Sequence, residues 1–250
     1  MVFIYRQEIL KDVSLFTSQP KAKFYDELFI NLDLSCITAY NSKIGRAGYS
    51  NHAMICAFIV MKCEGFSQIS DLHDYLSNNL IIAHYCGFDI SRELPSYAKF
   101  TRFIREFDNN MLQTVMQSQV LKAAGLSLID SSFIALDATP VKANVSNNNP
   151  KKDKFSKTSP PKADKDCRLG VQTASNQHNE KKYEFYWGYK NHILVDCISG
   201  LPVCELTTGA NVSDSSVTLE ILKRANSFLP LAECTFLADK AYDVKAIYGT

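Results

Sequence analysis

Two aspartates, each preceded by a short apolar run, are the residues of this chain whose type and position best suit metal-dependent chemistry. Asp137 follows the apolar run 133–136, and Asp239 follows the run 236–238. Each run predicts a buried strand with a carboxylate at its carboxyl end. Because two such carboxylates on neighbouring strands repel each other, a hard cation such as Mg²⁺ or Mn²⁺ is expected between them. Two ions about 4 Å apart could then bracket a phosphate. The alternative is that each aspartate only caps a turn.

Other polar residues near these aspartates are candidates for contact with a phosphate. Lys142, Lys190 and Lys240 lie close to the aspartates in the sequence, and the alternative for each is a solvated surface position. His192 and Asp196 are four residues apart on one predicted strand and therefore share a face. That face is either the side of the active site or a structural, hydrogen-bonded one.

The second half of the chain predicts the strands that position these residues. The segments 183–197 and 202–208 are rich in β-branched and aromatic residues, which predicts two strands joined by a tight turn. The segment 213–229 predicts a helix, and the segment 233–239 predicts a short strand that runs into Asp239. Either Ser213 or Asp214 is expected to cap the helix, and for Asp214 a cap is favoured over metal binding.

A long polar stretch separates the first two of these predicted strands. Residues from about 146 to 177 predict an exposed loop, and the part 151–168 holds seven basic and three acidic residues. It is either a solvated linker or a basic arm that contacts phosphates. In the strand that follows, Tyr186 is predicted to be exposed or to face a partner. The aromatic residues predicted to face the core alternate with it: Tyr183, Phe185, Trp187 and Tyr189.

The first half of the chain, residues 1–127, predicts a separate helical domain. Apolar residues recur at helical spacing over 51–63, 67–79, 95–107 and 110–124, and either Ser50 or Asn51 is expected to cap the first of these helices. An apolar stripe is predicted in the third helix, formed by Phe100, Phe103, Ile104 and Phe107. Residues 1–130 hold 12 basic and 13 acidic side chains, so this half is not conspicuously basic.

The overall composition sets broad limits on the class of protein. The 250 residues are 46% hydrophobic and 21% charged with a net charge of +1, which excludes disordered, collagen-like and coiled-coil chains. The longest apolar run, 53–61, is far shorter than the roughly 20 residues of a membrane-spanning helix. The N-terminus has no signal-peptide pattern. A cytoplasmic protein without a membrane partner is therefore expected. Its eight cysteines include no CxxC pair, which favours free thiols over disulfides or a zinc site.

Three sequence blocks, in this order, resemble those of bacterial insertion-sequence transposases with a DDE catalytic triad, of the type-four and type-five-like group. The blocks are FIALDATPVKAN, YWGYKNHILVDCISGLPVCELTTGANVSDSS and FLADKAYD. The helical first half resembles the N-terminal domain of the same group. The resemblance implies an α+β fold, with a helical domain at 1–127 and a ribonuclease-H-like, mixed-sheet catalytic core at 128–250 that contains the polar loop.

The resemblance also implies a chemistry and a partner. Asp137 would be the first catalytic acid and Asp239 the second, and together they would bind two Mg²⁺ or Mn²⁺ ions for strand cleavage and strand transfer. The partner would be double-stranded DNA, the inverted repeats of the protein's own element, and a homodimer is a further expectation. Weak candidates for contact with this DNA are Lys142, Lys190, His192 and Lys240.

The third acid of the family is not found in this sequence. In the family it is a glutamate on a helix that follows the second acid, within a tyrosine, arginine, glutamate and lysine signature. Glu220 and Glu233 both precede Asp239, so their order in the chain excludes them. The chain stops at Thr250, so we expect a C-terminally truncated core with little or no activity alone. The alternative function is a non-catalytic transposase remnant that binds DNA or poisons oligomers. A stand-alone ribonuclease-H-like nuclease is a third hypothesis, but it leaves the helical half unexplained.

Overall fold

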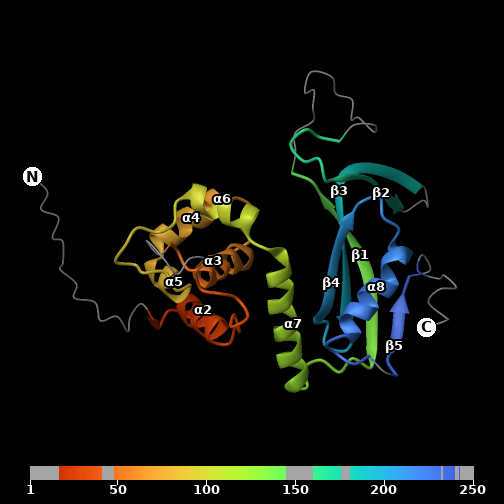
Figure 1. Cartoon of the computed structure of the whole chain (residues 1–250), viewed down its shortest axis with the longest axis horizontal. Coiled ribbons are helices and arrows are strands. Elements are labelled where there is room, and N and C mark those ends of the chain that lie inside the picture. The colour runs from red at the N-terminus through yellow and green to blue at the C-terminus, as the bar shows by residue number, and fades with distance from the viewer. Residues whose placement is uncertain are drawn as a thin grey trace, which may run out of the picture. The chain divides into compact units, whose positions relative to one another are not determined.

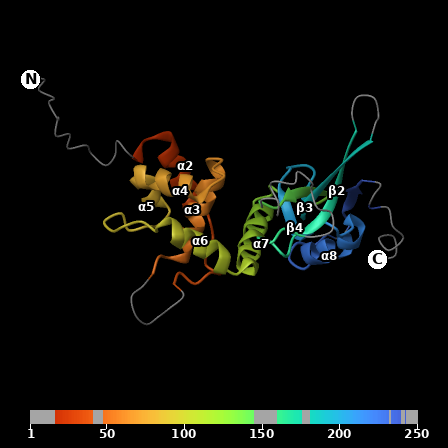
Figure 2. The same cartoon turned by 90° about the horizontal axis from the view of Figure 1, so that it is seen from above.

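The computed structural model describes residues 17–40, 48–144, 160–175, 181–231, 233–239 and 242. Contacts divide the chain into two compact units, Met1–Val115 and Met116–Thr250 (Figures 1 and 2). The division lies within helix α7 (Asn109–Gly125), earlier in the chain than the boundary expected after residue 127. No helix in the described part of the chain is both long and apolar enough to span a bilayer.

The first unit is helical, as its apolar periodicity predicts. Its described helices are α2 (Pro20–Ile30), α3 (Asn51–Cys63), α4 (Ile69–Asn78), α5 (Leu80–Tyr85) and α6 (Tyr97–Glu106), followed by α7. The N-cap of α3 is Ser50, one of the two residues expected there, and most residues of α3 are buried because nearly all of them are apolar. Phe100 and Phe103 of α6 and its C-cap Phe107 join the core. Ile104 is 54% exposed, because one residue beyond Phe103 the helix has turned away from that core.

A hydrogen-bonded carboxylate links three helices of the first unit. Glu64 directly follows α3, and its side chain is 14% exposed. It accepts hydrogen bonds from Lys21 Nζ at 2.5 Å, from the Tyr25 hydroxyl at 2.9 Å and from the Tyr75 hydroxyl at 3.0 Å. Burial raises the pKa of Glu64, but these hydrogen bonds outweigh burial and hold the pKa below its usual value. The network therefore stabilises the packing of α2 and α4 against the end of α3.

The second unit is built on a mixed β-sheet. Its elements in chain order are β1 (Phe133–Lys142), β2 (Arg168–Ser175), β3 (Lys181–Asp196), β4 (Pro202–Gly209), α8 (Asp214–Asn226) and β5 (Thr235–Ala238). β3 pairs antiparallel with β1, β2 and β4, whereas β5 pairs parallel with β1. This arrangement confirms the expected α+β class. The order β4–β3–β1–β5, in which only β5 is parallel to its neighbour, is consistent with the expected ribonuclease-H-like core.

Helix α8 lies along one face of this sheet (Figures 1 and 2). Ile134, Leu136 and Leu194 point to that face and are at most 3% exposed, and they pack in one core with Ile221 and Ala225 of α8. Because side chains alternate along a strand, their sequence neighbours point to the opposite face. That face carries apolar side chains that are more than one third exposed: Phe133, Val141, Val171, Tyr183, Phe185 and Leu237.

The aromatic residues of β3 occupy the opposite faces from those predicted. Tyr183 is 59% exposed and Phe185 is 38% exposed, whereas Tyr186, expected to point outward, is only 4% exposed. Tyr186 lies directly over Gly170 of β2, where an added Cβ would meet its ring at 2.7 Å. The side chains of β3 therefore alternate between two faces, as predicted. The face that α8 covers is the one with Tyr186 and Leu194, not the one with Tyr183 and Phe185.

Part of the expected polar loop is a strand. Residues 168–175 form β2, in which Leu169 lies opposite Trp187 and Val171 lies opposite Phe185. These cross-strand apolar pairs explain why the segment joins the sheet. Residues 160–167 form neither helix nor strand, and the remainder of the expected loop, 146–159 and 176–177, lies outside the described residues.

Candidate active site

Asp137 lies in the middle of β1, not at the end of a strand as predicted. It is paired with Ile193 of β3, and its exposed side chain points away from the face covered by α8. β1 continues past Asp137 because residues 138–142 keep their pairing with β3. The main-chain N–H of Ala138 donates a hydrogen bond to Asp137 Oδ1 at 2.8 Å. This bond orients the carboxylate while leaving it open to solvent.

Asp239 directly follows β5, and the register of the sheet places it beside Asp137. The parallel ladder pairs Leu136 with Ala238, so the next position along both strands is occupied by the two aspartates. Residues in register on adjacent strands point to the same face, and both aspartates are exposed. Neighbouring strands lie about 4.8 Å apart, which is close enough for both carboxylates to contact one ion. The structure therefore brings together the pair that the sequence singled out.

This pair of carboxylates fits a divalent cation that prefers oxygen ligands. Mg²⁺ is commonly bound through one or two carboxylates, with water and phosphate oxygens in its remaining positions. Within the described residues, no three or more His, Cys, Asp or Glu side chains gather as a metal site. The pair is therefore an open ligand set that water and a phosphate would complete.

The lysines predicted to contact phosphate have different surroundings. Lys142 is exposed and forms an ion pair with Glu184 at 2.6 Å. Lys190 is 19% exposed, and its ammonium donates to Asp214 Oδ1 at 2.9 Å. Lys190 is therefore not a solvated surface lysine, because it forms an ion pair with the first residue of α8. Lys240 lies outside the described residues.

His192 is buried in the core and offers no surface to a phosphate. Its exposed fraction is 0%, so the predicted DNA contact by this residue is wrong. His192 Nε2 lies 2.9 Å from Thr208 Oγ1, and Nδ1 lies 4.0 Å from Asp214 Oδ1. Burial lowers the pKa of His192. The charge of Asp214 opposes this shift, and the charge of Lys190 adds to it. The net lowering of the pKa keeps the ring neutral at physiological pH.

Asp196 and Asp214 also take structural positions on the α8 side of the sheet. Asp196 is fully buried, and its Oδ2 accepts hydrogen bonds from the N–H and the hydroxyl of Ser199 at 2.9 and 2.5 Å. Asp196 and His192 share a face as predicted, but it is not the face of Asp137. Asp214 is the first residue of α8 rather than its N-cap, and its carboxylate is held by Lys190.

Tyr242 is a residue of this region that sequence reasoning missed. Its side chain is 4% exposed within the core of the second unit. Its main-chain N–H donates to the carbonyl oxygen of Asp239 at 2.9 Å. The ADKAYD block carries this tyrosine three residues after the aspartate, and that spacing is the signal that could have identified it.

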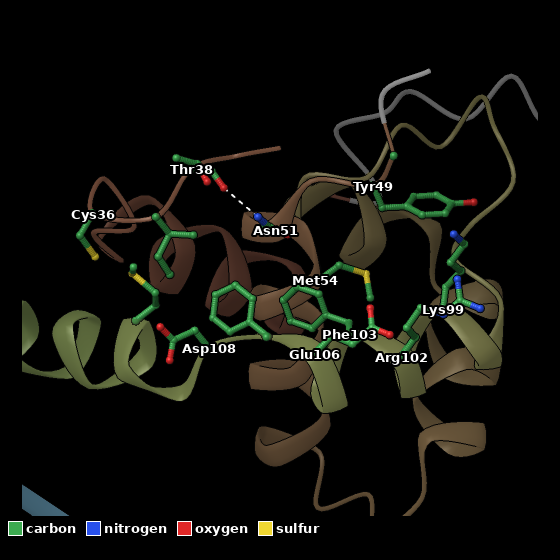
Figure 3. Close-up of a pocket in the computed structure, with 14 residues that line it drawn as sticks. Cys36, Thr38, Tyr49, Asn51, Met54, Lys99, Arg102, Phe103, Glu106 and Asp108 are labelled. Atoms are coloured by element: carbon green, nitrogen blue, oxygen red, sulfur yellow. Dashed lines mark hydrogen bonds between the residues drawn. The ribbon is translucent and has the colours of Figure 1, made fainter. Parts of the chain in front are cut away.

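The first unit contains a pocket of about 470 Å³ that sequence reasoning also missed (Figure 3). Met54 and Phe103 form part of its apolar wall, and Tyr49, Lys99 and Arg102 lie together at one end. None of the ion pairs in the described part of this unit involves Lys99 or Arg102. The pocket therefore presents two cations beside an aromatic ring, and the carboxylates of Glu106 and Asp108 also line it.

Comparison with known proteins gives two family matches. The family model described as "Transposase DDE domain" matches residues 129–250, and the one described as "Transposase domain (DUF772)" matches residues 13–106. No curated protein matches the chain. Among solved structures, the chain is similar to the "Mos1 transposase paired-end complex with left transposon end", with 11% sequence identity and a TM-score of 0.25. This match covers 96% of the present chain and 65% of the other, so the chain spans less than two thirds of that protein's length.

Proposed function

We propose that this chain, which belongs to the DDE transposases of insertion sequences, cleaves and joins DNA strands at the ends of its own element. The observation that carries the proposal is the parallel register of β1 and β5, which sets Asp137 beside Asp239. Both family matches agree with this assignment, because one covers the helical unit and the other covers the sheet with the two aspartates. The substrate of the proposed reaction is a phosphodiester of double-stranded DNA.

Asp137 and Asp239 would hold the divalent cations, Mg²⁺ or Mn²⁺. Bound there, such ions would activate water or a 3′-hydroxyl as the nucleophile and stabilise the leaving oxygen. The sheet contributes by fixing the separation of the two carboxylates, and the Ala138 N–H contributes by orienting Asp137 Oδ1. Because both carboxylates are on the face opposite α8, a DNA strand can approach them without displacing the core.

We further propose that the two aspartates alone support little or no strand transfer. Phosphoryl transfer depends on positioning and on stabilisation of charge, so an incomplete ligand set slows it severely. In the part of the chain that the structure describes, no third ligand completes the site. A plasmid excision assay tests this proposal, with no excision expected from the 250-residue chain. Robust excision that Asp137→Ala abolishes would contradict it.

Binding of Mn²⁺ tests the site without requiring turnover. The protein is titrated with MnCl₂, and the free ion is followed by electron paramagnetic resonance. Asp137→Asn and Asp239→Asn are each expected to weaken binding by more than about tenfold. Glu205→Gln is the matched control. Glu205 of β4 is paired with Ile193 of β3, which is itself paired with Asp137, so all three side chains point to the same face of the sheet. Equal binding by all four proteins would refute the proposed site.

The pocket of the first unit favours a second candidate function, binding of DNA without catalysis. Lys99 and Arg102 are exposed cations on the same helix, and each could contact a DNA phosphate. If they do, Lys99→Ala and Arg102→Ala will each weaken DNA binding in gel shifts and reduce the salt slope by about one. Lys62→Ala, an exposed lysine in the last turn of α3, is the control. Unchanged salt slopes in both variants would argue against this interface.

A further inference from the structure

A row of three neutral polar side chains crosses the sheet next to Asp137. The row consists of Thr139 of β1, Asn191 of β3 and Thr207 of β4, which are paired across the two ladders. Thr139 follows Asp137 by two residues in β1, so both side chains point to the face opposite α8. The Thr207 hydroxyl donates to Asn191 Oδ1 at 3.4 Å, so these two side chains meet on one face. The row therefore lies on the face of the candidate active site.

The separation between this row and Asp137 follows from the ladder between β1 and β3. Asp137 is paired with Ile193, so Asn191 is the diagonal neighbour of Asp137 on the adjacent strand. Diagonal neighbours lie about 7–8 Å apart, and Thr139 lies about 7 Å from Asp137 along β1. Successive phosphates of a nucleic-acid strand are separated by a comparable distance. A DNA strand with one phosphate at Asp137 can therefore place the next phosphate at the row.

The row has the chemistry of a phosphate contact that needs no cation. Asn191 is half-buried, and no hydrogen bond among the described residues uses its Nδ2, whose N–H groups are donors. Thr139 is exposed and adds a hydroxyl. Asparagine and threonine commonly contact DNA phosphates through such groups. The adjoining row instead carries two carboxylates, Asp137 and Glu205, which repel a phosphate unless a cation lies between them.

We propose that Asn191, oriented by Thr207 and flanked by Thr139, binds the phosphate next to the scissile one on the same DNA strand. This inference rests on the proposed function, since it places the scissile phosphate at Asp137. The contact holds the strand in line with the aspartates, and no bond is made or broken at the row. Because all three side chains are neutral, they add affinity without releasing counterions, unlike a lysine or arginine at a phosphate.

Binding of DNA in the presence of Mg²⁺ tests this contact in the full 250-residue chain. The probe is a fluorescein-labelled duplex of about 20 base pairs, followed by anisotropy, because phosphate contacts do not depend on its sequence. Asn191→Ala should weaken the Mg²⁺-dependent binding at least about tenfold, as expected for a lost hydrogen bond to a charged group, and leave the salt slope unchanged. Asn191→Asp should weaken it further, because it keeps the acceptor for Thr207 but sets a negative charge against the phosphate.

Gln172→Ala is the matched control for these variants. Gln172 is an exposed, neutral residue of β2, and it points to the opposite face from its neighbour Val171, which lies on the face of the aspartates. Gln172→Ala should bind DNA like the wild type. The melting temperature of Asn191→Asp should match that of the wild type, which separates a lost contact from a lost fold.

The outcomes distinguish this inference from the proposed function. If the wild type shows no Mg²⁺-dependent binding, or if Asp137→Asn retains it, the proposed function fails and the inference fails with it. If Asp137→Asn removes this binding while both Asn191 variants bind like the wild type, only the phosphate contact at the row is refuted. A smaller salt slope in Asn191→Ala, or equal weakening by Gln172→Ala, would also overturn the inference.

Discussion

Asp137→Asn should stabilise the metal-free protein and remove most of its stabilisation by Mg²⁺. The carboxylates of Asp137 and Asp239 occupy consecutive positions of a parallel ladder, on strands about 4.8 Å apart. Like charges in register on adjacent strands destabilise a sheet. If the pair exists to bind a cation, the protein carries this repulsion in its metal-free state, and removing one charge relieves it.

The magnitude follows from the separation and the exposure of the two carboxylates. Two unit charges about 5 Å apart interact by about 0.8 kcal/mol at the dielectric constant of water, which applies because both side chains are exposed. Asparagine keeps Oδ1 as the acceptor for the Ala138 N–H, a bond of 2.8 Å in the wild type. The free energy of unfolding should therefore rise by about 0.5–1 kcal/mol at low ionic strength. This gain should largely disappear in about 1 M salt, where the Debye length is about 3 Å.

Urea denaturation followed by tryptophan fluorescence measures this effect in the second unit of the chain, which contains both aspartates. Trp187 is the only tryptophan of the chain and lies in β3, so its signal reports unfolding of the sheet. Mg²⁺ at about ten times its dissociation constant should add about 1.4 kcal/mol to the wild type and less than about 0.4 kcal/mol to Asp137→Asn, whose affinity is expected to be more than about tenfold weaker. Glu205→Gln, on the same face, should behave like the wild type. An Asp137→Asn protein that is less stable in EDTA, or that Mg²⁺ stabilises as much as the wild type, would refute the reasoning.

Two further substitutions test the packing of each unit. Glu64→Gln should lower the free energy of unfolding by about 2 kcal/mol, because it removes the charge from a 14% exposed acceptor of three hydrogen bonds. Because folding lowers the pKa of Glu64, this contribution is present above the unfolded-state pKa and is lost as pH falls through the folded-state pKa. Urea melts followed by circular dichroism from about pH 7 to about pH 3 should show this loss in the wild type and in Glu106→Gln, but not in Glu64→Gln. Gly170→Ala should destabilise the second unit by about 1–3 kcal/mol, since its Cβ would meet the Tyr186 ring at 2.7 Å, whereas Gly125 has no such neighbour within 4 Å and serves as the control. Equal melting of the two alanine variants would count against this packing.

The sequence predicted the strands of the second unit well, but it misplaced Asp137 within its strand. Asp137 is followed by Ala138, Thr139 and Pro140, a composition typical of a turn. β1 nevertheless continues to Lys142, because residues 138–142 keep their pairing with β3. Among the described residues, β5 pairs only with 133–136, so the other edge of β1 has no described partner beside Pro140. A proline is tolerated in a strand with an open edge. The pairing with β3, which local sequence does not reveal, therefore decides where Asp137 lies in β1.

Alternation along β3 also predicted two faces without predicting which of them is covered. Tyr183 and Phe185 have the apolar rings of a core strand, yet they lie opposite the face that α8 covers. The face with Tyr186, His192 and Asp196 is buried because α8 packs on it, and Thr208 and Ser199 supply hydrogen-bond partners there for His192 and Asp196. These contacts join residues from different elements, so they depend on tertiary structure and not on local periodicity.

The chemistry of the candidate site depends on residues that take no part in it. A shift of one position in the pairing of β1 would turn Asp137 into the core and expose Leu136, which is costly because an isolated carboxylate would lose its hydration. The short strand β5 has fewer contacts to fix its register. Phe236 lies beside Ile134 and packs against the core of the second unit, so a shift of β5 would remove this side chain from its site. The position of Asp239 beside Asp137 is therefore set by the burial of apolar neighbours, and a substitution at Phe236 should impair cation binding without touching either carboxylate.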